Sequence, residues 1–419
     1  MVFLILSELN AVLNLKVHLT VLLSLMIMHT IRQRSQLHLL QHRNIHTNTS
    51  GAFSSRTLTA EQELLLLTSK LTFSKNEIEE ILNLISNNKI NWFSFFKLGC
   101  YHKTLALNFY NLQQISKELL FPKYLYEILN YISICTKAKN EANQLEIARI
   151  LKSCKEKNIV CIPVKGAYLI PNIYKNFAIR YSGDIDFLVK YCDINQLHKV
   201  LTDLGYKQGK LDLVNHTITS LSRTEEILWK TKMSNLYPYY KLTDNEIYPV
   251  FKLDFRFALD DSLDKSSVNE IVDFTAQNGF TSQIHYLVHL CTHFYGEAKH
   301  TLSIYRAKDM NLIKLCDIRE FALYCLTSKD QIEELLQFSR KYSLEKAIYY
   351  SFYCLSLVYN DDFSQEILQR LDIKELDFLH TFGDNATNEN KVFKKDFWDR
   401  LFSCDNSDEL SERPKFYIK

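Results

Sequence analysis

The architecture of this chain can be inferred from one segment, Arg180-Tyr-Ser-Gly-Asp-Ile-Asp-Phe-Leu-Val189. Residues 185–189 are a short run with apolar residues before and after a single aspartate, a pattern that predicts a buried strand. Side chains at i and i+2 of a strand face the same side of the sheet. Asp184 and Asp186 should therefore present two carboxylates together, while the apolar residues between and after them face the core.

Two adjacent carboxylates repel each other unless a cation lies between them. Hard oxygen ligands of this kind suit Mg²⁺, or Mn²⁺ in its place, bound together with substrate phosphates. Such a site can activate an attacking hydroxyl and neutralise charge on a phosphate during in-line displacement. The pair Asp184 and Asp186 therefore predicts a divalent metal site.

A third carboxylate is expected from a neighbouring strand. Residues 248–257 alternate between polar and apolar, which predicts such a strand, and Asp254 lies within it. Lys252 and Arg256 would share its face and be available to phosphate. The distance in sequence from Asp186 to this segment does not decide which aspartate is the third ligand. Asp260 and Asp261 therefore remain alternatives to Asp254.

Upstream of the aspartates, the β-branched run 158–165 predicts a strand that ends at Lys165-Gly166, where a helix begins. Free backbone N–H groups and an ammonium converge at such a step, so a phosphate could bind there. Only nine of the 419 residues are glycine, which makes a glycine at this position informative. A solvated lysine at the strand end is the simpler alternative.

The periodicity of the rest of the chain predicts helices on both sides of this region. The predicted regions, in chain order, are an apolar N-terminal segment and polar linker (1–58), an N-terminal helical region (59–157), an α/β core (158–281), a C-terminal helical region (282–383) and a tail (384–419). This is an α+β organisation, with a helix at 194–204 expected to end at Gly205.

The first 31 residues are strongly apolar in part, and Arg32 and Arg34 follow them. Glu8 and Lys16 interrupt the apolar run, which leaves it shorter than the ~20 residues that span a bilayer. Membrane association through residues 1–31 is therefore an alternative that we do not favour. The ten cysteines form no C-x-x-C pair, which is typical of thiols in a reducing cytoplasm.

The overall charge gives no strong signal for nucleic-acid binding. Lys and Arg total 50 and Asp and Glu total 48, so any basic patch must be local. Aromatic residues are spread along the helical regions and are not interleaved with basic clusters, as they would be on a surface that stacks bases.

The two motifs together resemble the uncharacterised nucleotidyltransferase family of the DNA polymerase β-like superfamily. The likeness is carried by Pro163-Val-Lys-Gly-Ala-Tyr-Leu169, by Arg180, and by Ser182-Gly-Asp-Ile-Asp-Phe-Leu-Val189. It extends to Leu253-Asp-Phe-Arg-Phe257 and to Ile284-His-Tyr-Leu-Val-His-Leu-Cys-Thr-His293, and covers roughly residues 60–350 by the order of the patterns. At the end of the first predicted strand, most members of the superfamily have Gly-Ser. This chain has Lys165-Gly166 there, as the uncharacterised family does.

The resemblance implies a small mixed β-sheet nucleotidyltransferase core flanked by N- and C-terminal helical regions. It implies metal-dependent transfer of a nucleoside monophosphate, most simply AMP from ATP, to a hydroxyl of an unknown small-molecule or protein acceptor, with pyrophosphate as product. Asp184, Asp186 and Asp254 would hold the metal. The nucleoside triphosphate would be bound by residues of the shared motifs and the later helix: Lys165, Gly166, Arg180, Ser182, Gly183 and His293.

Simpler interpretations stand beside these. His285, His289 and His293 share one helical face, where they could ligate zinc with a third ligand, or line a cleft, or pack a helix interface. Arg180 could pair with an aspartate structurally. A catalytically degenerate nucleotide-binding or scaffold protein of the same fold would keep much of this pattern.

Overall fold

The computed structural model describes residues 58–116, 121–359, 361–383 and 391–410. The apolar segment 1–31, the alternative site of membrane association, lies outside these ranges. Within them, no helix is both long enough and apolar enough to cross a bilayer.

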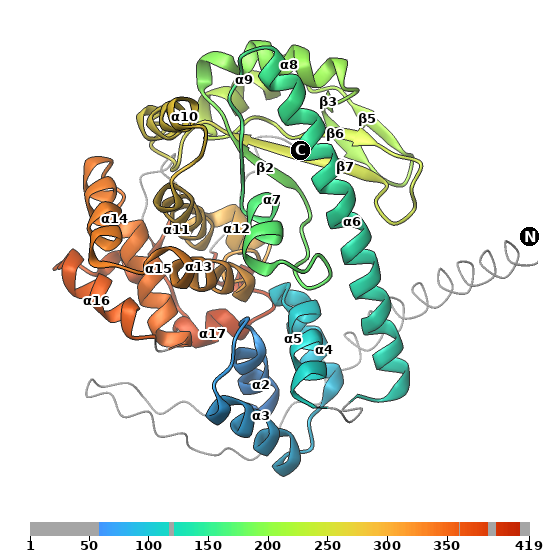
Figure 1. Ribbon diagram of the computed structural model, residues 1–419, viewed down its shortest axis with the longest axis vertical. Coiled ribbons are helices and arrows are strands. Elements are labelled where there is room, and N and C mark those ends of the chain that lie inside the picture. The colour runs from blue at the N-terminus through green and yellow to red at the C-terminus, as the bar shows by residue number, and fades with distance from the viewer. Residues whose placement is uncertain (1–57, 117–120, 360, 384–390, 411–419) are drawn as a thin grey trace, which may run out of the picture. The chain divides into compact units, whose positions relative to one another are not determined.

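A five-stranded sheet carries the two motifs (Figure 1), with the strand order β1-β2-β7-β6-β3. Its strands are β1 (Ile162–Val164), β2 (Ile185–Leu188), β3 (Lys207–Gln208), β6 (Tyr239–Leu242) and β7 (Val250–Arg256). The pair β2 and β7 is parallel, while the other neighbouring pairs are antiparallel. The sheet is therefore mixed, which confirms the predicted fold class.

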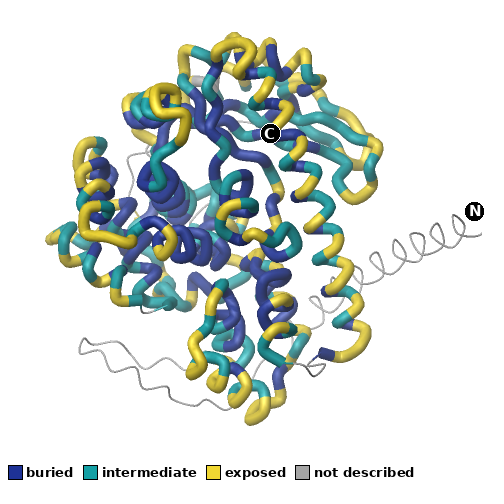
Figure 2. The backbone as a smooth tube through the Cα atoms, in the orientation of Figure 1, coloured by how far each residue is buried: buried dark blue, intermediate teal, exposed yellow. Residues whose placement is uncertain are grey.

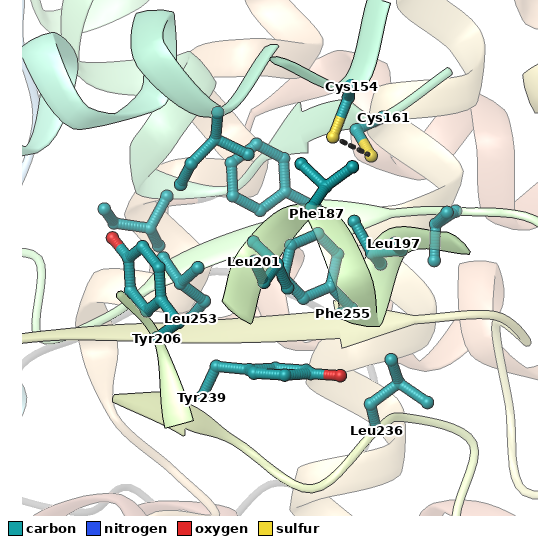
Figure 3. Close-up of a cluster of buried hydrophobic side chains, with 14 of the residues drawn as sticks. Cys154, Cys161, Phe187, Leu197, Leu201, Tyr206, Leu236, Tyr239, Leu253 and Phe255 are labelled. Atoms are coloured by element: carbon teal, nitrogen blue, oxygen red, sulfur yellow. Dashed lines mark hydrogen bonds between the residues drawn. The ribbon is translucent and has the colours of Figure 1, made fainter. Parts of the chain in front are cut away.

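Alternation along β2 and β7 directs large apolar side chains to one face of the sheet. Phe187 and Phe255, each 0% exposed, stack with their ring centroids 4.9 Å apart across the parallel pair. Residues of two helices, α6 (Lys123–Glu156) and α8 (Ile194–Asp203), join them in a single buried cluster (Figure 3). The opposite face is left for the polar residues of the same strands.

Helices precede and follow the sheet. Before it come α2 (Ala60–Thr68), α3 (Lys75–Asn87), α4 (Trp92–His102) and α5 (Leu105–Ile115), then α6. Within or directly beside the sheet lie α7 (Gly166–Leu169), the π-helix η2 (Ile170–Tyr174), η3 (Tyr191–Asp193), α8, α9 (Arg223–Lys232) and the hairpin β4 (Lys210–Asp212) and β5 (Thr217–Thr219).

The C-terminal part is mainly helical through Leu371 among the residues that the structure describes. Its helices are α10 (Ser266–Asn278), α11 (Gln283–Lys299), α12 (Thr301–Tyr305), α13 (Leu312–Cys325), α14 (Lys329–Lys341), α15 (Glu345–Val358) and α16 (Asp362–Leu371). Most of the α11 residues are buried (Figure 2). After them come η4 (Asp377–Leu379), β8 (Thr381–Phe382), β9 (Lys391–Val392), α17 (Phe397–Phe402) and η5 (Ser407–Glu409).

Local chemistry explains where several of these elements begin and end. Ser74 and Glu77 form a reciprocal capping box at the start of α3. Helix α8 ends just before Gly205, whose φ of 87° is a conformation that glycine adopts without steric cost, as predicted.

The structure also contains elements that the sequence pattern does not predict. Strand β6 is only four residues long and pairs with β7, which supplies the hydrogen bonds that stabilise it. The tail is anchored by Arg400 of α17, whose guanidinium donates to the carbonyl of Ala298 at 3.0 Å and pairs with Asp309. Buried ion pairing of this kind leaves no periodic signal in the sequence.

Candidate active site

Lys165 occupies the turn between β1 and α7. Its backbone has φ 50° and ψ −129°, a conformation that non-glycine residues rarely adopt and that costs on the order of 1–3 kcal/mol. Its Nζ donates to Oδ1 of Asp186 at 2.6 Å. The strained turn therefore places the ammonium on the second aspartate of the motif.

Gly166 is required at this turn because two side chains approach its Cα closely. A Cβ at this position would lie 2.5 Å from Oγ of Ser182 and 2.6 Å from Nη1 of Arg180. Neither neighbour is free to move, since Ser182 donates to the carbonyl of Asp184 and Arg180 is held by Asp317. The glycine thus allows α7 to pack directly against the segment that leads into β2.

We expect Gly166→Ala to lower the free energy of unfolding by about 1–3 kcal/mol, because the extra methyl must displace Ser182 or Arg180. Urea denaturation followed by circular dichroism would measure it. Gly296→Ala is the matched control, since a Cβ on this glycine of α11 meets nothing within 4 Å. The control should be neutral or stabilising by up to about 1 kcal/mol, and equal losses in both variants would contradict the packing argument.

Of the three carboxylates of the sequence prediction, Asp186 and Asp254 lie on the neighbouring strands β2 and β7, and Asp184 lies directly before β2. Asp186 and Asp254 are direct partners in the parallel β2–β7 register, and Asp184 lies two residues before Asp186. Asp260, the alternative third ligand, instead accepts hydrogen bonds from Ser262 in the loop after β7. Register therefore favours Asp254 as the third member of the group.

Each carboxylate has a hydrogen-bond donor beside it. Lys165 binds Asp186, Lys252 of β7 donates to Oδ2 of Asp184 at 2.9 Å, and the Asn235 amide donates to Oδ1 of Asp254 at 2.8 Å. Lys252 and Asp254 lie on the same face of β7, as the sequence predicts.

The pKa values of Asp184, Asp186 and Lys165 depend on one another. Burial raises the pKa of Asp186, and the neighbouring Asp184 and Asp254 raise it further, to about 7, in spite of Lys165. Burial alone would raise the pKa of Asp184, but Lys252 and Lys165 hold it below its ordinary value. Burial lowers the pKa of Lys165, yet the aspartates more than offset this effect and raise it. Another cation beside Asp186 would relieve the repulsion among the carboxylates.

The donor set fits a divalent metal by its chemistry. Hard carboxylate oxygens of the kind that divalent metals prefer lie on β7, on β2 and directly before β2, and Asp186 is protonated more readily than an ordinary aspartate because it is buried and lies near two other carboxylates. In the described ranges no group of three or more His, Cys, Asp or Glu side chains is already arranged around a common point. Lys165 and Lys252 engage two of the carboxylates instead.

Arg180 makes a two-pronged ion pair with Asp317 of α13. Its Nε and Nη2 donate to the two carboxylate oxygens at 2.9 and 2.5 Å, and the Tyr174 hydroxyl donates to the same carboxylate at 2.7 Å. Arg180 is 7% exposed. The contact fastens the loop before β2 to the C-terminal helices, and so positions the aspartate strand.

A pocket opens above these residues and includes most of the predicted site. Lining residues that the sequence predicts are Lys165, Gly166, Arg180, Ser182, Gly183, Asp184, Asp186 and His293. Asp254 is not among the lining residues, although its charge acts on both Lys165 and Asp186.

The three histidines of α11 have different surroundings. His285 packs between Phe274 and Phe338, so it belongs to a helix interface. His289 is 1% exposed, and burial holds its pKa well below the ordinary value. His293 lines the pocket, with Nε2 3.6 Å from Oε2 of Glu297.

Sequence reasoning missed four charged residues of the same pocket: Lys103, Glu297, Lys308 and Lys314. They come from α11, from the end of α4 and from the α12–α13 region, and of the four only Glu297 lies close to a motif, four residues after His293. Glu297 pairs with Lys314 at 2.5 Å, and burial is more than offset by Lys314 and Lys165, which lower the pKa of Glu297 to about 2. No local pattern marks these residues.

Comparison with known proteins agrees with this geometry. A family model described as an uncharacterised nucleotidyltransferase matches residues 88–360, a range that contains every pocket residue named above. No curated protein and no solved structure matches the chain.

Proposed function

The chain belongs to the uncharacterised nucleotidyltransferase family, as its sequence predicted, and we propose a function on that basis. We propose that the protein transfers AMP from ATP to a hydroxyl group in a reaction that requires Mg²⁺. The acceptor is a small molecule or a protein. Nucleotidyl transfer in general follows from the family, while the donor, the metal and the acceptor type are our proposal.

One observation carries the proposal. The parallel register of β2 and β7 brings Asp254 beside Asp186, with Asp184 two residues away, on the sheet face opposite the apolar core. Lys165 and Gly166 border the same pocket at the end of β1. Carboxylates for a metal and an ammonium for phosphate therefore meet in one place.

The residues would share the work as follows. Asp184, Asp186 and Asp254 would hold Mg²⁺ or Mn²⁺, which when bound neutralises phosphate charge and lowers the pKa of the acceptor hydroxyl. Lys165 would leave Asp186 to bind the triphosphate. The acceptor oxygen forms a bond to the α-phosphorus, the bond to the departing pyrophosphate breaks, and Asp254 takes the hydroxyl proton.

Arg180, Ser182, Gly183 and His293 have supporting roles in this proposal. Arg180 positions the aspartate strand through Asp317 and, with Ser182, lines the pocket beside Gly166. Gly183 leaves the pocket edge open, and His293 contacts the nucleotide or the acceptor from α11.

A second candidate is a non-catalytic nucleotide-binding protein of the same fold. The observation that favours it is that lysines already occupy two of the three carboxylates, Lys165 on Asp186 and Lys252 on Asp184. Such a protein would bind nucleotide without needing a metal.

We also propose a cytoplasmic location. The ten cysteines are all free thiols, and Cys154 and Cys161 lie 3.6 Å apart between sulfur atoms without forming a disulfide. Membrane attachment through residues 1–31 remains the alternative, and fractionation of the tagged chain would distinguish the two locations.

Isothermal titration tests the proposal. ATP and the other three nucleoside triphosphates are titrated into the full chain with and without Mg²⁺, and then into the Asp184→Asn, Asp186→Asn double variant. We expect ATP to bind in a Mg²⁺-dependent manner, and the variant to lose that dependence. Asp203→Asn, an exposed aspartate of α8, is the control and should bind as the parent does.

The other outcomes are equally informative. Tight triphosphate binding that is the same with and without Mg²⁺, and the same in the double variant, would favour the non-catalytic candidate. Binding of no triphosphate at all would refute both candidates.

A further inference from the structure

The helical side of the pocket carries three lysines, which we call the lysine cluster: Lys103, Lys308 and Lys314. Lys103 follows α4 and has φ 59°, Lys308 lies in the turn between α12 and α13, and Lys314 lies in the first turn of α13. All three line the pocket that also contains Asp184 and Asp186. Positions more than 200 residues apart in sequence thus converge on one side of one site.

The cluster is only partly neutralised. Glu297 pairs with Lys314 at 2.5 Å, so two further positive charges remain on this side of the pocket. Burial lowers the pKa of Lys103, and Lys314 and Lys308 lower it further, while Glu297 and Asp184 act in the opposite direction. Burial also lowers the pKa of Lys308, even though Glu297 acts in the opposite direction. An anion between these lysines would remove the unfavourable interaction among them.

The backbone adds to the positive potential at this place. Asn311 is the N-cap of α13, and Asn311, Ile313 and Lys314 all line the pocket. The N-terminus of a 14-residue helix carries a partial positive charge, which favours bound anions. The helix end and the lysine cluster therefore favour the same kind of ligand.

We propose that Lys103, Lys308 and Lys314 form an oxyanion subsite for a phosphate-type group, distinct in residues from the Lys165-Gly166 step. A phosphate group carries about two negative charges at neutral pH, which matches the two positive charges of Lys103 and Lys308 on this side of the pocket. This inference rests on the proposed function. The group comes either from the terminal phosphates of the nucleotide or from an anionic acceptor.

The test uses inorganic pyrophosphate without metal, and ATP and AMP with Mg²⁺, titrated calorimetrically into the full chain. The variant is Lys103→Gln, Lys308→Gln, which leaves the Lys314–Glu297 pair intact. The control is Lys152→Gln, Lys199→Gln, two exposed lysines of α6 and α8 that do not line the pocket. A Lys103→Arg, Lys308→Arg variant restores charge.

We expect pyrophosphate affinity to fall roughly tenfold per lysine removed, hence about a hundredfold in the Gln variant, and to recover in the Arg variant. If the affinity for ATP falls in parallel while the affinity for AMP does not, the subsite binds the terminal phosphates of the nucleotide. If ATP affinity is unchanged while pyrophosphate weakens, the subsite serves an anionic acceptor. Equal pyrophosphate affinity in the Gln variant and the lysine control would overturn the inference.

Failure of the proposed function gives a different result. In that case the triphosphates bind without Mg²⁺ dependence or do not bind, while metal-free pyrophosphate still distinguishes the Gln variant from its control. The two ideas can therefore fail separately.

Discussion

Arg180→Met is expected to lower the free energy of unfolding by about 3–5 kcal/mol, the loss typical of removing one partner from a buried ion pair. Side-chain exposure is 9% for Arg180 and 5% for Asp317, and the two oxygens of the carboxylate are 2.9 and 2.5 Å from the guanidinium. Methionine fills much of the same space but leaves Asp317 buried without its counter-charge. Urea denaturation would measure the change.

A surface ion pair provides the control for this result. Arg370 and Glu366 of α16 lie 2.8 Å apart, but their side chains are 30% and 41% exposed. Solvent screens such a pair, so Arg370→Met should cost no more than about 1 kcal/mol. If Arg180→Met costs no more than this control, the loop before β2 is not fastened through Asp317 in the way the structure implies.

Asp186→Asn is expected to slow Mg²⁺-dependent pyrophosphate release from ATP roughly a thousandfold, equivalent to about 4 kcal/mol of transition-state stabilisation. The amide cannot replace the carboxylate as a metal ligand. The fold should remain, because burial and the neighbouring aspartates raise the pKa of Asp186 to about 7, so its neutral form is already populated near neutral pH. Asparagine has nearly the same shape as that neutral form.

The assay offers water in place of the natural acceptor, so the natural acceptor need not be known. Pyrophosphate release is followed by a coupled colorimetric reaction, and thermal denaturation verifies that the variant is folded. Asp203→Asn, on the exposed side of α8, is the control and should retain the parent rate. A folded Asp186→Asn protein with the parent rate would refute the catalytic role of this carboxylate.

Much of the core could be predicted because its signals are local. Alternation in residues 248–257 predicted Lys252 and Asp254 on one face of a strand, and in the structure both lie on one face of β7. The Asp184–Asp186 spacing placed two carboxylates near each other, and both line one pocket. Glycine at position 205 marked the end of α8, where φ is 87°.

Other features depend on partners that are distant in sequence. Strand β6 is short and is stabilised by pairing with β7, and β3 is shorter still, so neither has a strong pattern of its own. Arg180 had two interpretations, phosphate ligand or structural ion pair, and its contact with Asp317, 137 residues away, became visible only in three dimensions.

The amino-acid sequence by itself determined the strand that carries Asp186 and begins directly after Asp184, the Lys165-Gly166 turn and the helical regions around them, because each follows from the residues nearest to it. The tertiary structure alone decided that Asp254 pairs in register with Asp186, and that Lys103, Lys308 and Lys314 meet in the same pocket. Charges collected from segments some 200 residues apart are brought together by packing of the helices and the sheet, and no local pattern encodes that packing.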